Sequence, residues 1–201
     1  MTPADDVAGL DDLPFRTEVQ IALLLVSPRH RYEGRPADGA LPPRSTDPDE
    51  RRDRIELRAG LGIVGDRYFA ARAHVHASVT VIGLEGLEAV GQAIGTTVDP
   101  VASRRNVFLR GADVEALRGQ PFSLESLLPG GDGSGSGDLG RAVRFRGYRA
   151  ANPCAWMDHE VAPGAFRAMR GRGGVRCDPE SDGVLALGPA VLRTARPVPL
   201  G

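Results

Sequence analysis

The stretch SVTVI at residues 78–82 is a run of β-branched and apolar residues, a composition that favours a buried β-strand. Residues 84–94 follow directly and carry four apolar residues three or four positions apart, which is the spacing of an amphipathic helix. These residues are Leu84, Leu87, Val90 and Ile94. Gly95 is expected to end the helix, because glycine adopts the left-handed cap conformation without steric cost. The sequence therefore predicts a strand that passes straight into a short helix.

Short apolar segments on both sides of this unit predict further strands. Residues 19–26 (VQIALLLV) are the most apolar of these, and a helix of that length would be marginal, so we expect a strand. The other predicted strands are residues 55–61, 106–109, 141–149, 184–187 and 190–192, the last two forming a hairpin around Gly188 and Pro189.

Two further helical segments complete the predicted elements. Residues 114–117 are expected to form one helical turn, and residues 152–170 a helix that Pro163 and Gly164 split into two short ones. Short strands outnumber helices, and glycine and proline, with 26 and 16 residues, favour turns. The sequence thus predicts a mainly β fold, a β-barrel with a few short α-helices.

The length of 201 residues suits one domain with a sizeable core. Residues 1–16 are polar and contain two prolines, so they are expected to form a loose N-terminal tail before a single domain at 17–196. Residues 32–54 are charged and rich in proline, and residues 130–140 consist mainly of glycine, serine and aspartate. We expect both to be flexible loops within that domain.

The charge composition excludes several classes of function. The formal net charge is −1, so no broad basic field exists to attract nucleic acid. All 25 basic residues are arginine, and a chain without lysine cannot form the internal Schiff base of pyridoxal-phosphate enzymes. A P-loop is excluded for the same reason. Local clusters of arginine could still hold a small anion.

The cysteine count and the N-terminus point to a cytoplasmic protein. Two cysteines are too few for a disulfide framework, and the first residues are acidic where a signal peptide would be basic. The most apolar segment is far too short to cross a membrane, so no membrane partner is expected. A reducing compartment is the default for such a chain.

The tripeptide Asn152-Pro153-Cys154 is the strongest local sign of chemistry. Asparagine is a favoured helix N-cap and proline a favoured first residue, which would place Cys154 second in a helix. Free backbone N–H groups there favour the thiolate, which is both a nucleophile and a soft metal ligand. The alternative is a buried, inert cysteine. Cys177 lacks a comparable signal, and we expect it to be structural.

Histidines and arginines offer weaker signals. If the chain is extended at His74 and His76, both imidazoles point to one side and could form a zinc site with Cys154 and His159. No metal-ligand spacing supports this, so we favour exposed or hydrogen-bonded histidines. Arginines precede a strand at 104–106 and follow a helix at 170–174 with glycines. Such groups suit phosphate, but surface arginines and a helix cap explain them equally well.

Taken in chain order, these fragments resemble the MOSC family, the domain named after the C-terminal part of molybdenum-cofactor sulfurases. Residues 62–68 (GIVGDRY) are similar to that family's G-x-x-G-D-R-[HY] motif, and residues 79–85 to its V-T-L-I-x-x-E motif. The remaining matches are the R-x-N segment at 104–107, the G-x-D-x-x-x-L-x-G turn at 111–119, Pro153-Cys154, the arginine-glycine motif at 172–174 and the closing strands at 183–191. The resemblance covers roughly residues 18–195.

The resemblance implies a fold, a cofactor and a set of site residues. The family fold is a β-rich barrel that holds the molybdenum cofactor, a pterin dithiolene with a phosphate tail. Cys154 would ligate the metal or carry sulfur. Arg105, Asn106 and Arg172 would contact the phosphate and the pterin, together with Arg67 and Asn152. The partner domains of larger family members are absent, so we expect a standalone form of the domain.

Three hypotheses follow for the function. The first is a molybdenum-dependent oxidoreductase that removes oxygen from N-hydroxylated or similar small molecules, with electrons from an external reductase because no flavin or iron–sulfur motif is found. The second is a sulfur-carrier or cofactor-handling protein that uses a Cys154 persulfide and an external sulfur donor. The third is a metal-free cysteine-nucleophile enzyme with His159 as base, although His159 would lie roughly 140° around a regular helix from Cys154.

Overall fold

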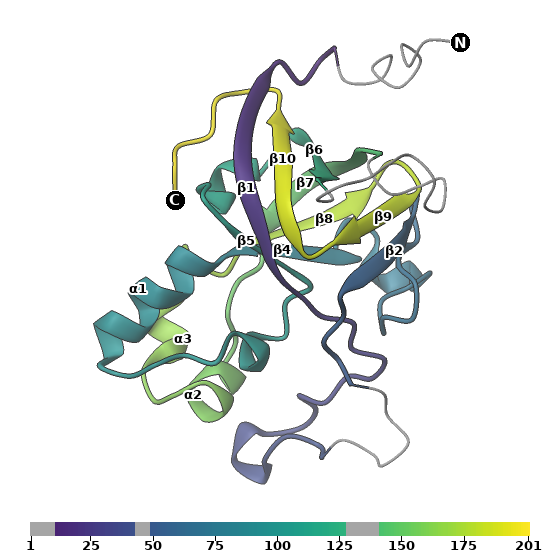
Figure 1. Ribbon diagram of the computed structural model, residues 1–201. Helices are drawn as coiled ribbons and strands as arrows, with labels where there is room; N and C mark the ends of the chain where they lie inside the picture. Colours follow the sequence, from purple (N-terminus) through teal and green to yellow (C-terminus); the bar gives the residue numbers. More distant parts are fainter. Residues whose placement is uncertain (1–10, 43–48, 128–140) are drawn as a thin grey trace.

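The computed structural model describes residues 11–42, 49–127 and 141–201, and most of its strands form one closed barrel (Figure 1). The barrel strands, in order around it, are β1 (Phe15–Leu24), β10 (Gly188–Thr194), β6 (Pro121–Ser126), β7 (Val143–Ala150), β8 (Val175–Pro179), β4 (Val79–Gly83) and β5 (Val107–Arg110). A small second sheet contains β3 (Gly62–Ile63), β2 (Arg54–Arg58) and β9 (Gly183–Ala186), in that order. The prediction of a mainly β protein built on a barrel is confirmed.

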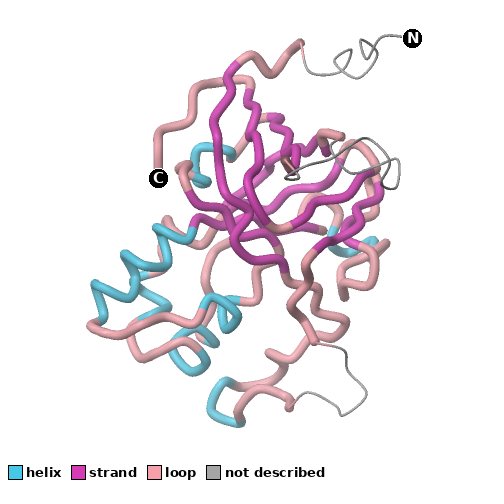
Figure 2. Tube along the Cα trace, viewed as in Figure 1, coloured by secondary structure: helices cyan, strands magenta, loops and turns pink. Residues whose placement is uncertain are grey.

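The α-helices are few and short, as predicted, and lie together at one end of the barrel, whereas some 3-10 turns lie elsewhere around it (Figure 2). They are α1 (Leu84–Ile94), α2 (Trp156–Glu160) and α3 (Ala165–Ala168), with 3-10 turns at Pro36–Asp38, Arg72–His74, Pro100–Ser103 and Val114–Leu117. Helix α1 connects β4 to β5, which pair in parallel and therefore need a crossover between them. The other pairs in the barrel are antiparallel. No helix in the described part of the chain is long and apolar enough to cross a membrane.

The domain begins earlier than the sequence predicted. We expected a loose tail to residue 16, but Leu13 is fully buried and β1 starts at Phe15, which pairs with Thr194 of β10. The polar residues Arg16 and Glu18 hid this start from the sequence pattern, because they occupy the outward positions of a strand that faces solvent on one side. Residues 1–10 of the predicted tail lie outside the described part of the chain.

The two predicted loops have different outcomes. The loop at 130–140 lies outside the described residues, as do residues 43–48 of the loop at 32–54. The described part of the second loop is anchored, because the ring of Tyr32 stacks on that of Trp156 at 5.2 Å and its hydroxyl donates to the carbonyl of Ala102. The same burial raises the pKa of Tyr32 to about 12. This anchoring makes Tyr32 and Trp156 part of the wall of a pocket at the helical end of the barrel.

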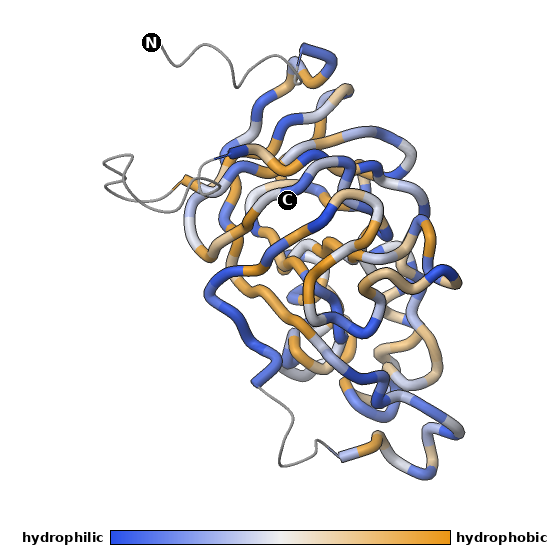
Figure 3. The backbone as a smooth tube through the Cα atoms, turned by 90° about the vertical axis from the view of Figure 1, so that its right-hand side faces the viewer, coloured by the Kyte–Doolittle hydropathy of each residue, from blue (hydrophilic) through white to orange (hydrophobic). Residues whose placement is uncertain are grey.

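The apolar core has two parts. The first fills the barrel, where Phe122 and Phe145 stack at 5.1 Å and Cys177 is fully buried. The second lies between the barrel wall and the helices and includes Phe108 and Trp156. Each large side chain that is fully removed from water contributes about 1.5–3 kcal/mol. Figure 3 shows hydrophobic stretches inside the molecule, while hydrophilic stretches follow many of its outer loops.

Gly174, just before β8, is a position where only glycine fits. Its φ of +87° is a left-handed conformation, and a Cβ there would lie 2.2 Å from the carbonyl oxygen of Val81. Gly119 has a similar φ of +73°, but a Cβ there would meet nothing within 4 Å. The two positions therefore differ in steric space and not in backbone conformation.

We expect Gly174→Ala to lower the free energy of unfolding by about 3 kcal/mol, since it adds a clash with backbone to the left-handed strain. Gly119→Ala should cost only about 1 kcal/mol from the strain alone. Urea unfolding of both variants measures the difference. Equal losses would show that the barrel can shift at Val81 to accept a side chain.

Candidate functional site

A buried carboxylate organises the segment that follows β3. The chain turns at Gly65, with φ +83°, and places the side chain of Asp66 out of solvent. Asp66 Oδ2 accepts from the backbone N–H of Ser27 at 3.0 Å and from Asn106 Nδ2 at 3.1 Å. Asp66 Oδ1 accepts from the N–H of Tyr68 at 3.0 Å. These donors offset the cost of burying the charge and fix the direction in which Arg67 leaves the turn.

Asn106 completes this arrangement from the start of β5. Its Oδ1 accepts from the N–H of Thr80 at 3.0 Å, and its Nδ2 donates to the carbonyl of Leu25 at 3.2 Å as well as to Asp66. Both amide hydrogens are therefore used within the protein. The sequence resemblance predicted a cofactor contact for Asn106, but its amide lies buried beneath the site and joins three segments of the chain.

A cavity of about 280 Å³ lies above this pair, and we call it the cysteine pocket. Its lining residues are His30, Tyr32, Arg67, Tyr68, Ser103, Arg104, Arg105, Asn152, Cys154, Trp156, Met157 and Arg176. The structure thus brings together four of the predicted site residues, namely Arg67, Arg105, Asn152 and Cys154. Four guanidinium groups share the pocket with a single thiol.

Arg67 is the most unusual of these arginines. Its side chain is 12% exposed, and its Nε and Nη1 atoms are buried without a hydrogen-bond partner among the described residues. Its nearest carboxylate atom, Asp66 Oδ2, lies 3.8 Å from Nη1 and already accepts two hydrogen bonds. Its Cζ lies 4.4 Å from the centre of the Tyr68 ring. A buried guanidinium with unused donors is costly and is suited to receive an anion.

Arg105 is partly committed to the fold. Its Nε, Nη1 and Nη2 donate to the carbonyl oxygens of Gly173, Ser103 and Ala151 at 2.9, 3.3 and 2.9 Å. Burial lowers the pKa of Arg105 to about 10, with the charge of Arg176 adding to the effect and a Cys154 thiolate opposing it. The group stays charged at neutral pH. A guanidinium has five N–H donors, so Arg105 keeps two for a ligand.

The remaining two arginines differ in how far they are neutralised. Arg104 forms a two-pronged ion pair with Glu50, with both N···O distances 3.1 Å, and its Nη2 also donates to the carbonyl of Arg29. Arg176 has no carboxylate or carbonyl partner for its guanidinium among the described residues. Burial lowers the pKa of Arg176, whereas negative charge on Tyr68 or Cys154 would raise it. Arg105 and Arg176 therefore have no carboxylate partner among the described residues, and Arg67 has only the 3.8 Å contact with Asp66.

Cys154 is exposed at the pocket, but not on the helical turn that the sequence predicted. Helix α2 begins at Trp156, so Cys154 precedes it, and its carbonyl accepts from the N–H of Met157 at 2.9 Å. The split of the segment at Pro163 and Gly164 is confirmed, with α3 starting at Ala165. Tertiary packing of Trp156 against Tyr32 sets the start of α2 instead of the Asn-Pro cap signal. Charges from Arg105 and Arg176, not a helix end, surround the thiol.

Arg172 was predicted to bind the same cofactor, but the structure places it elsewhere. It lines a separate cavity of about 400 Å³ beside Glu85 and Glu115, and its Nη1 donates to the carbonyl of Ala168 at 3.3 Å. The glycines beside it explain the difference. Gly173 and Gly174 fit tightly against the barrel, and Arg172 before them lines a cavity that does not include Cys154.

The histidines do not gather around a metal. A 3-10 turn precedes His76, and His76 itself has a φ of +68°. The chain is therefore not extended there, as it would have to be for both imidazoles to point to one metal. His74 packs on the Tyr68 ring at 4.0 Å, and His76 on the Tyr148 ring at 4.1 Å. His159 lies 3.0 Å from Glu160 and does not line the cysteine pocket. Within the described residues, no cluster of three or more histidine, cysteine or acidic side chains could hold a metal ion.

Cys177 is structural in position, as expected. It is fully buried in the barrel, and burial raises the pKa of its thiol well above the usual value. Its neighbour Arg176 was missed as a site residue, although a signal was present. Alternation along β8 sends Val175 and Cys177 into the barrel and so points Arg176 outward, toward Cys154. Tyr68 was also missed, although it belongs to the matched GDRY segment.

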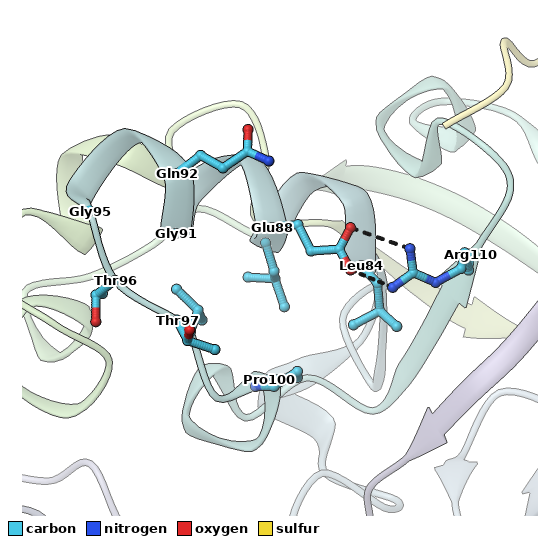
Figure 4. Close-up of a pocket in the computed structure, with 11 residues that line it drawn as sticks. Leu84, Glu88, Gly91, Gln92, Gly95, Thr96, Thr97, Pro100 and Arg110 are labelled. Atoms are coloured by element: carbon cyan, nitrogen blue, oxygen red, sulfur yellow. Dashed lines mark hydrogen bonds and ion pairs between the residues drawn. The ribbon is translucent and has the colours of Figure 1, made fainter.

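A larger cavity, of about 780 Å³, lies between α1 and the loop that follows it (Figure 4). Leu84 and Leu87 form part of its wall, and the Glu88 and Arg110 side chains bond to each other at one side. Its two charged side chains, Glu88 and Arg110, neutralise each other. The larger cavity therefore offers a ligand no unpaired charge from the described residues. The cysteine pocket, although smaller, holds the uncompensated charges and the exposed thiol.

Comparison with known proteins supports the barrel and goes no further. The chain is similar in fold to the YuaD protein from Bacillus subtilis, with 16% identity and a TM-score of 0.61 over 91% of this chain and 99% of that one. It is also similar to a protein described only as hypothetical, with 13% identity and a TM-score of 0.53 over 91% and 70% of the two chains. No family model and no curated protein matches the sequence. Identities this low establish a shared fold alone.

Asn106→Ala should lower the free energy of unfolding by about 3 kcal/mol, because it leaves the Thr80 N–H and one lone pair of the Asp66 carboxylate without a buried partner. Asn152→Ala, at an exposed position on the same pocket, should change it by less than about 0.5 kcal/mol. Chemical denaturation of both variants gives the comparison. A small loss for Asn106→Ala would mean that Asp66 does not depend on this contact.

His30 and His74 should both titrate below the ordinary pKa of 6.5. For both, burial is the main cause of the lowered pKa, and nearby arginines add to it. Arg149 acts on His74 and not on His30, so Arg149→Gln should raise the pKa of His74 and leave that of His30 unchanged. NMR titration of the two imidazoles measures this. Equal shifts at both histidines would contradict the placement of Arg149.

Proposed function

We propose that this protein binds the molybdenum cofactor in the cysteine pocket, with Cys154 as a ligand of the metal. The observation that supports this most directly is the buried guanidinium of Arg67, whose Nε and Nη1 have no acceptor among the described residues and which shares its pocket with an exposed thiol. A ligand for such a pocket must carry negative charge and also present a centre that binds sulfur. The order of motifs along the sequence agrees with this ligand.

The residues present fit the anionic and the soft part of such a cofactor. Arg105 and Arg176 have no carboxylate partner among the described residues, and Arg67 and Arg105 keep unused donors, so phosphate oxygens would find charged hydrogen-bond partners. Cys154 supplies the thiolate that a soft metal centre prefers. The cavity, at about 280 Å³, is slightly smaller than the usual range for ligand sites of about 300–1,000 Å³, and its exposed residues Asn152 and Cys154 leave room for a ligand to extend outward.

When bound, the cofactor would supply the two-electron chemistry that removes oxygen from an N-hydroxylated or similar small substrate. The chain's own residues bind and orient. Arg67 and Arg176 would neutralise negative charge, and Tyr68, whose ring contacts the His74 ring and the Arg67 guanidinium, lines the pocket. Burial lowers the pKa of His30, which favours the neutral form of its imidazole.

The geometry favours one of the other hypotheses and not the remaining two. A persulfide carrier at Cys154 is favoured by the same exposed thiol and the cationic groups around it. A metal-free nucleophile with His159 as base is not, because His159 contacts Glu160 and lies outside the pocket. A zinc site is not favoured either, because His74 and His76 pack on different tyrosine rings. The external reductase, the sulfur donor, the small-molecule substrate and the cytoplasmic location stay predictions.

Wild-type protein purified from a host that makes the cofactor should contain close to one molybdenum per chain. Cys154→Ala should lose most of it, because the metal loses its protein ligand, and Arg176→Gln should lose part through the missing charge. Arg172→Gln should retain it, since Arg172 lines another cavity. Elemental analysis together with pterin fluorescence after oxidation measures both parts of the cofactor.

The matched arginine variants decide where the cofactor binds. Loss in Arg172→Gln with retention in Arg176→Gln would place the cofactor away from the cysteine pocket. A wild-type protein without molybdenum or pterin would overturn the proposed function.

A further inference from the structure

We propose a further activity for the same thiol: in the absence of any metal, Cys154 takes the outer sulfur atom of thiosulfate and releases sulfite. The inference does not depend on molybdenum. It rests on the charge balance of the cysteine pocket, on the position of the thiol at its surface, and on the chemistry that these two features allow together.

The charge balance selects the ligand. Arg104 is neutralised by Glu50, and three donors of Arg105 are used by backbone carbonyls. Arg67 and Arg176 remain, the first with two buried atoms that lack acceptors and the second without a partner for its guanidinium among the described residues. Asp66 lies near Arg67 and Glu50 pairs with Arg104, so the four arginines of the pocket keep a net charge of +2, which fits one dianion. A tetrahedral oxyanion offers several oxygen acceptors at once, which matches the forked donors of arginine.

The thiol restricts which dianion can react. Phosphate and sulfate would bind but have no atom that a thiolate attacks readily. Thiosulfate presents a similar tetrahedron of charge and carries a sulfur atom bonded to sulfur, as a disulfide does. Cys154 is exposed and lines the same pocket as the guanidinium groups of Arg105 and Arg176. The pocket therefore places a sulfur nucleophile beside a site for an anionic sulfur donor.

The step balances without an oxidant or a reductant. The Cys154 thiolate attacks the outer sulfur of thiosulfate, a new S–S bond forms at Cys154, and the S–S bond of thiosulfate breaks. The electron pair of the broken bond leaves with sulfite. The products are a Cys154 persulfide anion and one sulfite dianion, with the same total charge as the reactants. Arg67 and Arg176 would stabilise the charge that develops on the departing sulfite.

The test uses the full chain prepared free of molybdenum and incubated with thiosulfate. Intact-protein mass spectrometry should show the gain of one sulfur atom, peptide mapping should place it on Cys154, and one sulfite should appear for each persulfide. Arg67→Met and Arg176→Gln should each slow the loading about tenfold or more, because each removes one charge that binds the dianion. Higher ionic strength should slow wild-type loading as well.

Matched controls separate recognition from thiol reactivity and from folding. Arg172→Gln should load like the wild type, since it lines another cavity. Hydroxyethyl disulfide, which is uncharged, should react with Cys154 in Arg67→Met and Arg176→Gln at rates much closer to that of the wild type. Cys154→Ser should gain no sulfur, whereas a persulfide found on the buried Cys177 would contradict the site.

The proposal is overturned if thiosulfate does not load the wild type, or if both arginine variants load at the wild-type rate. Its outcome is separate from that of the molybdenum experiment. Sulfur loading in a protein that never acquires molybdenum would support this activity and reject the proposed cofactor. Molybdenum binding without sulfur loading would support the cofactor and reject this activity.

Discussion

The candidate site depends on one buried interaction, the contact between the carboxylate of Asp66 and the amide of Asn106. Through its other hydrogen bonds this pair joins Leu25 and Ser27 after β1 to Thr80 at the start of β4 and to the turn after β3. A buried charge is tolerated only when its lone pairs are used, so these segments must meet in one arrangement. That arrangement holds Arg67 at the edge of the pocket.

The pocket above this pair keeps charge that the fold does not neutralise. Arg104 shows how the protein satisfies a buried guanidinium when the role is structural, with the two oxygens of Glu50 and a backbone carbonyl. Arg67 has no comparable partner, and Arg176 none among the described residues. Leaving such groups uncompensated costs stability, and proteins accept that cost mainly where a ligand completes the site. Both proposed activities use these two charges with Cys154, and they differ in the anion that is bound.

Individual predictions succeeded where the determining forces were local. The strand at 78–82 and the helix at 84–94 follow from side-chain spacing, and the break at Pro163 and Gly164 from the geometry of proline. Predictions failed where a contact between distant segments of the chain determined the local structure. Helix α2 starts at Trp156 and not after Asn152, because Trp156 packs on Tyr32. The start of β1 was placed too late, because the outward residues of its first part are polar.

The sequence by itself determined the class of fold and predicted Cys154 as the candidate for chemistry. Periodicity of two in the strands and three or four in α1 is written in the chain, and so is the presence of Cys154 among many arginines. Only the tertiary structure decided which arginines surround that thiol. Arg176 joined it and Arg172 did not, because alternation along β8 and the tight fit of Gly173 and Gly174 against the barrel set where each side chain points. The tertiary structure likewise decided which charges are neutralised, because Arg104 and Glu50 are far apart in the sequence and meet only in the folded barrel.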